Sequence, residues 1–457
     1  MTTTTADQRA PAAIEFHSID YIPVSERHGK VWNQATLWFL ANAELATLAV
    51  GLIGISLGLS LFWALVAIVL GEIFGTFFMA FHAVQGPRMG IPQLLQSRPQ
   101  FGYYGALIPQ AIGVFLYVGF NVFNTIIGGQ ALAAVTGLNS QLSILIMAGV
   151  ALLLTLYGYD WIHWINKWGS YIFLVVIAVV AAYQVSQAPY VSDYSRYLKP
   201  TETVRSTFLW TYFGSAIGSF WMIALGALLL AGNPTAQTVD AVAAGGNAIF
   251  NGFGTISLAI ALIGLVSVIA LNLYSGSLAA IAAFDAVHPI QPSVTLRVIG
   301  ILFIAVLGTA GSLLLPQDFL SSYSNFLTIL LYFLTPWTAV NLVDFYFVRR
   351  GNYAIAEIFN PAGIYRRWNW RGLVSYFVGF AVMIPFFSTN LYVGPIANAL
   401  GKADFSIFIG LPVSALLYYF LARNQDLTEE RRLAMTEADA LEAAAEAGQA
   451  PSAAPAS

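Results

Sequence analysis

The chain has 457 residues, of which 58% are hydrophobic and only 9% are charged, and its formal net charge is −3. A soluble domain carries about 25% charged residues, so this chain cannot cover itself with a surface compatible with water. The long apolar runs predict a helical protein that crosses a membrane many times, because a membrane barrel would alternate apolar and polar residues instead. The chain has no cysteine, which excludes disulfides, thiolate metal sites and cysteine nucleophiles.

The distribution of polar residues divides the chain into three regions. Residues 1–30 have no apolar core and no cleavage site, which predicts a cytoplasmic N-terminal tail rather than a signal peptide. Residues 31–423 form the predicted transmembrane domain. Residues 424–457, rich in Ala and Glu and then in Pro and Ser, predict a cytoplasmic tail with a short solvated helix followed by disorder. About 11 apolar runs in the transmembrane domain are long enough to span a bilayer: 36–58, 60–84, 104–133, 139–158, 168–190, 207–231, 250–284, 298–316, 321–347, 373–393 and 405–422.

The run from residue 168 to residue 190 leads to two conflicting topologies. If the N-terminus is cytoplasmic and this run counts as two crossings, nearly all Lys and Arg residues lie inside, as the positive-inside rule requires. Its length, however, is sufficient for only one crossing. From the length we expect one continuous or slightly kinked helix over 168–190, which would leave Arg196–Arg205 across the membrane from Lys167.

Several segments resemble the purine–cytosine permeases, the first nucleobase:cation symporter family, in the order and spacing of that family. They are GIPQLLQSRPQFG (90–102), YVGFN (117–121), APYVSDYSRYL (188–198), LNLYSGSLA (271–279), PWTAVNLVDFYFVRRGNYAIAEIF (336–359) and IYRRWNWRG (364–372). The resemblance implies an all-α polytopic membrane protein with a leucine-transporter-like inverted five-plus-five repeat and extra C-terminal helices. Members usually have twelve helices, so this chain resembles a member that lacks part of the fifth and sixth helices.

The resemblance also implies a function. The chain is expected to import a purine or pyrimidine nucleobase (cytosine-like), or a related heterocycle, with H⁺ or Na⁺ by alternating access. The expected partners are the nucleobase, the coupling cation and the lipid bilayer of the cell (inner or plasma) membrane, with no nucleic acid and no cofactor. The alternative is a substrate-binding or sensing protein on the same fold that no longer transports. We expect no enzyme, since no nucleophile, metal or acid–base set converges in the sequence.

Three acidic or amide residues stand out in the first two spans. Glu44 lies deep in the first span, where a carboxylate costs roughly 2.5–3.5 kcal/mol, and its neighbourhood is where the first helix of relatives breaks. It is interpreted either as a substrate or proton ligand or as an interfacial carboxylate satisfied by a neighbouring helix. Asn42 could bind a ligand or the preceding helical turn. Glu72, in the second span, is interpreted as structural rather than as a proton relay.

The third span carries an aromatic and amide pair suited to a flat heterocycle. Tyr117 and Asn121 are four residues apart and so share a helix face, with Phe120 beside them. A heteroaromatic ring stacks on an aromatic face and pairs with an amide at its edge, and the resemblance assigns those roles to these positions. The alternative is ordinary aromatic packing with an interhelical amide bond.

The resemblance assigns further roles to residues of the later spans. Tyr183 and Gln184 fall where relatives place substrate contacts in the sixth helix, and Asn272 falls where relatives contact the ligand in the eighth. Ser267 is the hydroxyl nearest to the position where relatives bind a cation between the first and eighth helices. One hydroxyl is few for sodium, which prefers five or six oxygens, so proton coupling through Glu44 is favoured over sodium coupling.

Overall fold

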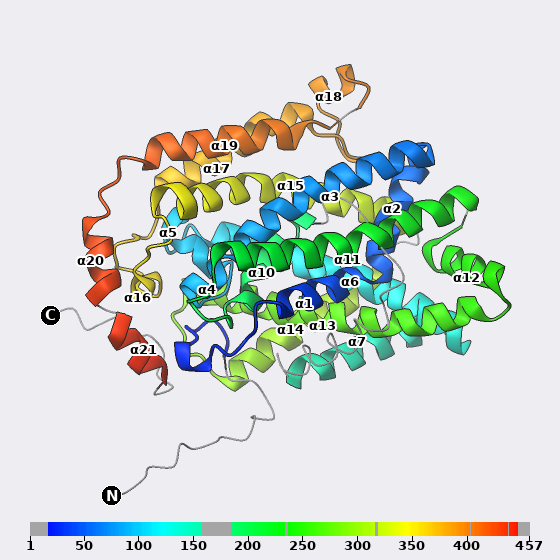
Figure 1. Cartoon of the computed structure of the whole chain (residues 1–457), viewed down its shortest axis with the longest axis horizontal. Helices are drawn as coiled ribbons and strands as arrows, with labels where there is room; N and C mark the ends of the chain where they lie inside the picture. The colour runs from blue at the N-terminus through cyan, green and yellow to red at the C-terminus, as the bar shows by residue number, and fades with distance from the viewer. Residues whose placement is uncertain are drawn as a thin grey trace, which may run out of the picture.

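The structure is a computed structural model that describes residues 17–157, 184–233, 236–315, 319–402, 404–436 and 438–446. Within these ranges the regular structure is helical, and the long helices lie roughly along one axis (Figure 1). Helices α20 (Thr428–Thr436) and α21 (Ala438–Glu446) lie at one end of the bundle, called here the tail end. Helices α12 (Thr238–Ile249) and α18 (Pro395–Ala399) lie at the opposite end, called here the far end.

Each of the other ten predicted spans contains a helix, whereas only residues 184–190 of the run 168–190 are described. Among the described residues, six helical stretches are long and apolar enough to cross a membrane, or up to seven if the bent first span counts as one. The helices in the predicted spans after the first are α3 (Leu61–Ala83), α6 (Leu107–Thr136), α7 (Ser140–Tyr157), α11 (Val204–Gly232), α13 (Phe253–Val287), α14 (Val294–Leu314), α15 (Phe319–Val343), α17 (Trp370–Met383) and α19 (Ser406–Ala422). Of these, α7, α17 and α19 are shorter than the six long stretches. The connecting elements are α4 (Gln85–Met89), α5 (Arg98–Phe101) and α16 (Ile355–Ile358), the 3₁₀ turns Val24–Glu26, Leu95–Ser97 and Ile384–Phe386, and the π-helical turn Asp344–Val348.

The first span is broken into α1 (Asn33–Asn42) and α2 (Leu45–Ser56), whose axes differ by 56°. Ala43 leaves the helical conformation and Glu44 is extended, with φ −144° and ψ 168°. The break lies where the resemblance places it. In a membrane-spanning helix, such a break is tolerated where the irregular backbone is buried in protein or lines a cavity.

Both halves of the first span pack closely against α11. A Cβ added at Gly214 would lie 2.3 Å from the Cα of Ala35, and one at Gly218 would lie 2.6 Å from the Cα of Phe39. These two glycines are four residues apart, which is the small-residue spacing that lets two membrane helices approach at backbone distance. The close approach holds the break in the first span beside the middle of α11.

The residues that follow the undescribed segment 158–183 begin in the middle of the bundle. Gln184 hydrogen-bonds to Ser219, which lies midway along α11. The chain turns at Ser186 and Gln187 and then forms α10 (Ala188–Ser195), which runs toward the tail end. The continuous helix expected over 168–190 therefore lies mostly outside the described residues, and its described part contains this turn.

Arg196 shows on which side the chain emerges from this segment. Its guanidinium donates to the carbonyl oxygen of Ser18 at 3.1 Å, and the amide of Gly29 donates to the carbonyl of Tyr197 at 3.1 Å. Residues that follow α10 therefore lie at the tail end with the N-terminal segment, as the charge distribution predicts. The separation of Arg196–Arg205 from Lys167, which the length of 168–190 predicts, stays a prediction. Lys167 lies outside the described residues.

Buried ion pairs join separate segments of the chain at the tail end. Arg98 pairs with Asp285 at 2.7 Å, and Arg349 pairs with Asp344 of the π-helical turn and with Glu430 of α20 at 2.8 Å. Both arginines are at most 1% exposed. The helix α20 is thus docked on the bundle, whereas the sequence predicts a solvated tail helix.

Candidate substrate and coupling site

Glu44 caps the second half of the first span. Its carboxylate accepts hydrogen bonds from the amide of Ala46 at 2.6 Å and from the amide and hydroxyl of Thr47, both at 2.9 Å. These donors include amides that the first turn of a helix leaves without intrahelical partners. The side chain is 1% exposed. Its position at the break matches the expectation, and its geometry is that of a helix cap.

Asn42, the last residue of α1, bonds both to its own helix and across the break. Its Nδ2 donates to the carbonyl of Trp38 at 2.6 Å and to the hydroxyl of Ser215 at 3.1 Å. Its Oδ1 accepts from the amide nitrogen of Gln187. Asn42 thus makes the expected bond to the preceding turn and also holds α1 to the segment before α10, while its role as a ligand contact stays a prediction.

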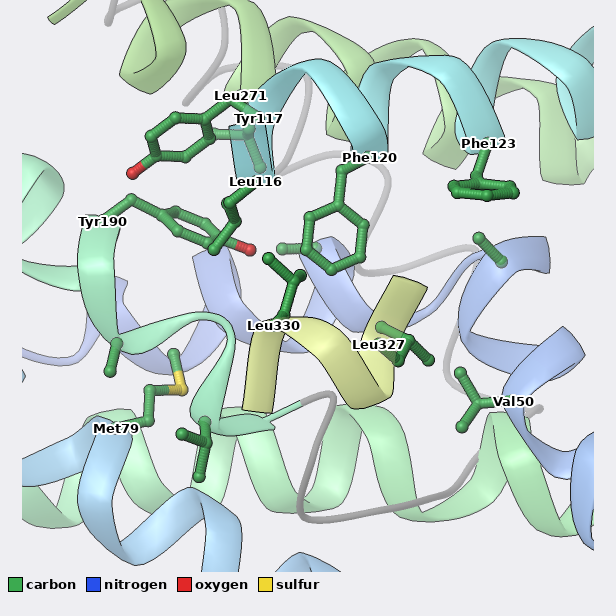
Figure 2. Close-up of a cluster of buried hydrophobic side chains, with 14 of the residues drawn as sticks. Val50, Met79, Leu116, Tyr117, Phe120, Phe123, Tyr190, Leu271, Leu327 and Leu330 are labelled. Atoms are coloured by element: carbon green, nitrogen blue, oxygen red, sulfur yellow. The ribbon is translucent and has the colours of Figure 1, made fainter. Parts of the chain in front are cut away.

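Aromatic rings from three elements meet beside this break. The rings of Trp38 in α1 and Tyr190 in α10 lie 5.4 Å apart, and those of Tyr117 in α6 and Tyr190 lie 5.5 Å apart. Figure 2 shows Tyr117 and Tyr190 next to each other, with Leu116 beside them. Tyr194, one helical turn beyond Tyr190, packs edge-on against Trp38 at 5.9 Å. The rings form an aromatic cluster that can stack on a flat heterocycle.

Phe120 and Asn121 contact helices that do not contribute to this cluster, α15 and α14. Phe120 packs edge-on against Phe326 of α15 at 5.3 Å, and Figure 2 shows it among Leu327 and Leu330. Asn121 lies against α14, since a Cβ added at Gly308 would be 2.8 Å from the Cβ of Asn121. The four-residue spacing thus does not place Asn121 beside Tyr190. Its Nδ2 donates to the carbonyl of Tyr117, and its Oδ1 has no hydrogen-bond partner among the described residues.

Asn272 and Ser267 both lie on α13 and are 1% exposed. At Gly276, one turn beyond Asn272, a Cβ would lie 2.9 Å from the Cβ of Tyr117, so α6 and α13 cross at close distance there. The Oδ1 of Asn272 has no hydrogen-bond partner in the part of the chain that the structure describes. A buried amide oxygen without a partner costs about 1–3 kcal/mol, which a ligand or water can recover.

Gln184 joins the break in the first span to an acid in α3. Its Oε1 accepts from Ser215 and its Nε2 donates to Ser219, both at 2.5 Å. Ser219 in turn donates to Glu72 at 2.8 Å. Tyr183, the other residue expected here, lies outside the described residues. The connected side chains, called here the polar chain, are Gln187, Asn42, Ser215, Gln184, Ser219 and Glu72.

Sequence reasoning did not identify several of these residues. Trp38 precedes Asn42 by one helical turn, and Gln187 follows Gln184 by three residues, so helical spacing offered a signal for both. Ser215 and Ser219 are likewise four residues apart on α11. None of these spacings shows which residues of distant helices meet.

The sequence matches known permeases over most of its length. Residues 21–172 and 165–410 match the model of a family described as permeases for cytosine/purines, uracil, thiamine and allantoin. A protein of Bacillus subtilis (strain 168) that is named as a candidate purine-cytosine permease is 37% identical over 444 residues, covering 90% of this chain and 96% of that protein. The purine-cytosine permease fcyB of Emericella nidulans is 24% identical over 466 residues, covering 89% of this chain and 88% of that protein.

Solved structures confirm the fold. Mhp1, a nucleobase-cation-symport-1 family transporter in a closed conformation with bromovinylhydantoin bound, is similar with a TM-score of 0.72 at 20% identity. The match covers 91% of this chain and 97% of that chain. The inward-facing conformation of Mhp1 gives a TM-score of 0.68 at 19% identity, covering 96% and 100%. The all-α inverted-repeat architecture of a multi-pass membrane transporter is therefore confirmed. The chain belongs to the family of permeases for cytosine/purines, uracil, thiamine and allantoin.

Proposed function

We propose that this chain imports a purine or pyrimidine nucleobase, or a related heterocycle, with H⁺ or Na⁺ by alternating access across the cell membrane. The observation that carries the proposal is the meeting of aromatic rings and amides at the break in the first span. Trp38, Tyr117 and Tyr190 offer ring faces, while Asn42 and Gln184 offer paired donors and acceptors. A nucleobase needs both kinds of contact, one for its face and one for its edge.

The names of the relatives support the same substrate class. Two of them are named for purines and cytosine, and the family description adds uracil, thiamine and allantoin. All of these molecules are, or contain, nitrogen heterocycles with donors and acceptors in the ring plane. Broken helices near the midplane are the elements that bind substrate and ion in transporters built from inverted repeats.

The test uses purified protein in proteoliposomes and radiolabelled cytosine, adenine and uracil. We expect accumulation of at least one of these bases under an inward H⁺ or Na⁺ gradient. Tyr117→Ala should weaken its binding by about 1–3 kcal/mol, the usual cost of removing an aromatic that stacks on a base. Tyr392→Ala, at an exposed position remote from the site, is the matched control and should bind like the parent.

The outcomes separate a carrier from a binding protein. Binding of a base in detergent without accumulation under either gradient would identify a protein that binds or senses the substrate without transporting it. If the parent binds none of the three bases, the proposed substrate class is wrong.

The same vesicles identify the coupling cation. Accumulation driven by a pH gradient in sodium-free buffer supports proton coupling, which the buried acids of the first two spans favour. Accumulation that follows Na⁺ without a pH gradient supports a sodium site formed by Ser267 and backbone carbonyls of the broken first span.

A further inference from the structure

Glu72 is a carboxylate at the midpoint of the membrane-spanning helix α3 and is only 3% exposed. Leu70 and Ile73 on the same helix are 62% and 56% exposed and mark the side that faces lipid. Glu72 instead faces the interior of the bundle, where α3 packs against α11. An ionisable residue at this depth is costly, and such residues mark ion, proton or substrate pathways in membrane proteins.

The shorter hydrogen bonds of the polar chain run in one direction, toward Glu72, whereas two longer ones of 3.4 Å run back from Asn42 and Ser215 to Oε1 of Gln187. Asn42 donates to Ser215, Ser215 donates to Gln184, Gln184 donates to Ser219, and Ser219 donates to Glu72. In these four bonds each donor points along the polar chain toward the carboxylate of Glu72. Glu72 also accepts from the hydroxyl of its neighbour Thr76 at 3.2 Å. This arrangement is the one that an ionised carboxylate requires, since it can only accept hydrogen bonds.

Protonation of Glu72 changes the hydrogen bonds at the Glu72 end of the polar chain. A neutral carboxyl can donate its own O–H to Ser219, and the Ser219 hydroxyl then turns to the carbonyl oxygen of Ser215, which lies 2.8 Å away. Hydrogen bonds in a chain polarise one another, so removing the charge at Glu72 weakens the bonds that hold Gln184 and Asn42. The amides at the substrate site are then less strongly held to each other and are available to a ligand.

We infer that Glu72 is the proton-binding residue of the transport cycle, and that its proton loosens the polar chain so that the amides of Gln184 and Asn42 turn to the nucleobase. The inference rests on the proposed function. The proton arrives from the side of higher proton activity and leaves on the other side with the substrate, and only the O–H bond of Glu72 forms and breaks. Glu44 is less suited to this role because its carboxylate caps α2.

The charged surroundings of Glu72 come from several helices. Tyr212 of α11 interacts electrostatically with it. His82, on α3 itself, lies ten residues away, toward the tail end. The helix α2, which also packs against α3, has no titratable side chain. The other titratable side chains on the described helices that contact α3 are Arg88 of α4, Tyr190, Asp193 and Tyr194 of α10, Arg205 of α11, and Tyr323 and Tyr332 of α15.

The test measures binding of the transported base as a function of pH in purified protein, together with proton uptake reported by a pH indicator. In the parent, affinity should rise as pH falls, by a factor in the range of about 5 to 150 that is typical of coupled sites. By linkage, substrate binding should take up a proton. Glu72→Gln mimics the neutral carboxyl, so it should bind tightly at every pH, take up no proton and lose accumulation driven by a pH gradient.

Two further variants make the test specific. Ser219→Ala leaves the carboxylate in place but removes the hydroxyl that links Gln184 to Glu72, so the affinity for the base should lose its pH dependence. If Glu72→Gln fails to fold, Ser219→Ala still tests the inference. Glu202→Gln is the same chemical change at a partly exposed residue before α11 and should behave like the parent. If Glu72→Gln and Ser219→Ala keep the parent's pH dependence and accumulation, the role of Glu72 is overturned while the proposed function stands. If the parent binds none of the bases, both proposals fall.

Discussion

At the scale of single residues, the site is defined by polar atoms buried between helices. Asn272 and Asn121 each have a buried amide oxygen without a hydrogen-bond partner among the described residues, whereas Glu44, Asn42 and Gln184 are fully engaged with protein groups. The first kind of residue gains most from a ligand, because an unpaired buried acceptor is costly. The second kind must exchange existing bonds to bind one.

Asn272→Ala should weaken binding of the transported base by about 1–3 kcal/mol, the cost of leaving a buried polar edge of the ligand unpaired. Direct binding to purified protein measures this change. Asn398→Ala, in the short helix α18 at the far end, is the matched control and should leave the affinity unchanged. An unchanged affinity in Asn272→Ala would remove this residue from the substrate site.

Glu44→Gln should lower the stability of the protein by about 1 kcal/mol, as the loss of a helix cap does. A glutamine has one side-chain oxygen, so it cannot accept from the amides of both Ala46 and Thr47 in the present geometry. The midpoint of thermal unfolding reports the change, and Glu44→Asp, which retains a capping carboxylate, is the control. Proton-driven accumulation should persist in Glu44→Gln, because we assign the proton to Glu72. Loss of accumulation with retained exchange would instead support Glu44 as the proton carrier.

At the scale of elements, the N-terminal segment and the tail helices close one end of the bundle. Arg27, 1% exposed, donates to the carbonyls of Ile22 and Pro87. Glu442 of α21 accepts from the hydroxyl of Tyr21 at 3.1 Å, which joins the two ends of the described chain. These segments are polar in sequence and are ordered by contacts with each other and with the bundle.

The docking of the N-terminal segment should depend on pH through His17. Burial opposes the charge of this side chain, but hydrogen bonds to Asp20 and Glu26 outweigh it and raise the pKa of His17 to about 9 from 6.5. Because the folded-state pKa is raised, the stabilisation is fully present below pH 6.5 and is lost as the pH rises through about 9. Hydrogen exchange of residues 17–27, corrected for the intrinsic effect of pH, should increase across that window.

A pair of histidine variants checks the assignment. His17→Gln should raise exchange of the segment at neutral pH and remove its dependence on pH. His288→Gln, at an exposed position after α13, should leave the profile unchanged. The same pH profile in His17→Gln and in the parent would assign the effect to another group.

At the scale of the whole molecule, the arrangement of charges predicts a topology with which the contacts of Arg196 agree. Arg196 and the residues that follow α10 share the tail end with the N-terminal segment, α20 and α21 (Figure 1). Most arginines and lysines of the sequence belong to segments at this end, so the positive-inside rule predicts that the tail end is cytoplasmic.

Single cysteines can test this orientation directly, because the chain has none of its own. Leu391→Cys, 81% exposed at the far end, should react with a membrane-impermeant maleimide in intact cells. Thr201→Cys, exposed at the tail end, should react only after the cells are permeabilised. Labelling of Thr201→Cys in intact cells would reverse the orientation.

The sequence by itself determined the class of protein, the position of nearly every span, the break near Glu44 and the family. The length of apolar runs, the distribution of charge and the spacing of motifs are local properties, so they can be recognised in the sequence without knowledge of the fold. The run 168–190 stays a prediction, because residues 168–183 lie outside the part of the chain that the structure describes.

Only the tertiary structure decided which buried polar groups meet. Asn42 and Gln187 are 145 residues apart in the sequence, and Glu72 and Ser219 are 147 apart. The sequence therefore predicted Asn42 and Gln184 separately, set Glu72 aside as structural, and paired Asn121 with Tyr117 on one helix face. Hydropathy places a residue at a depth in the membrane, but the rotation and close approach of helices such as α1 and α11 decide what it contacts, and that depends on backbone packing at Gly214 and Gly218.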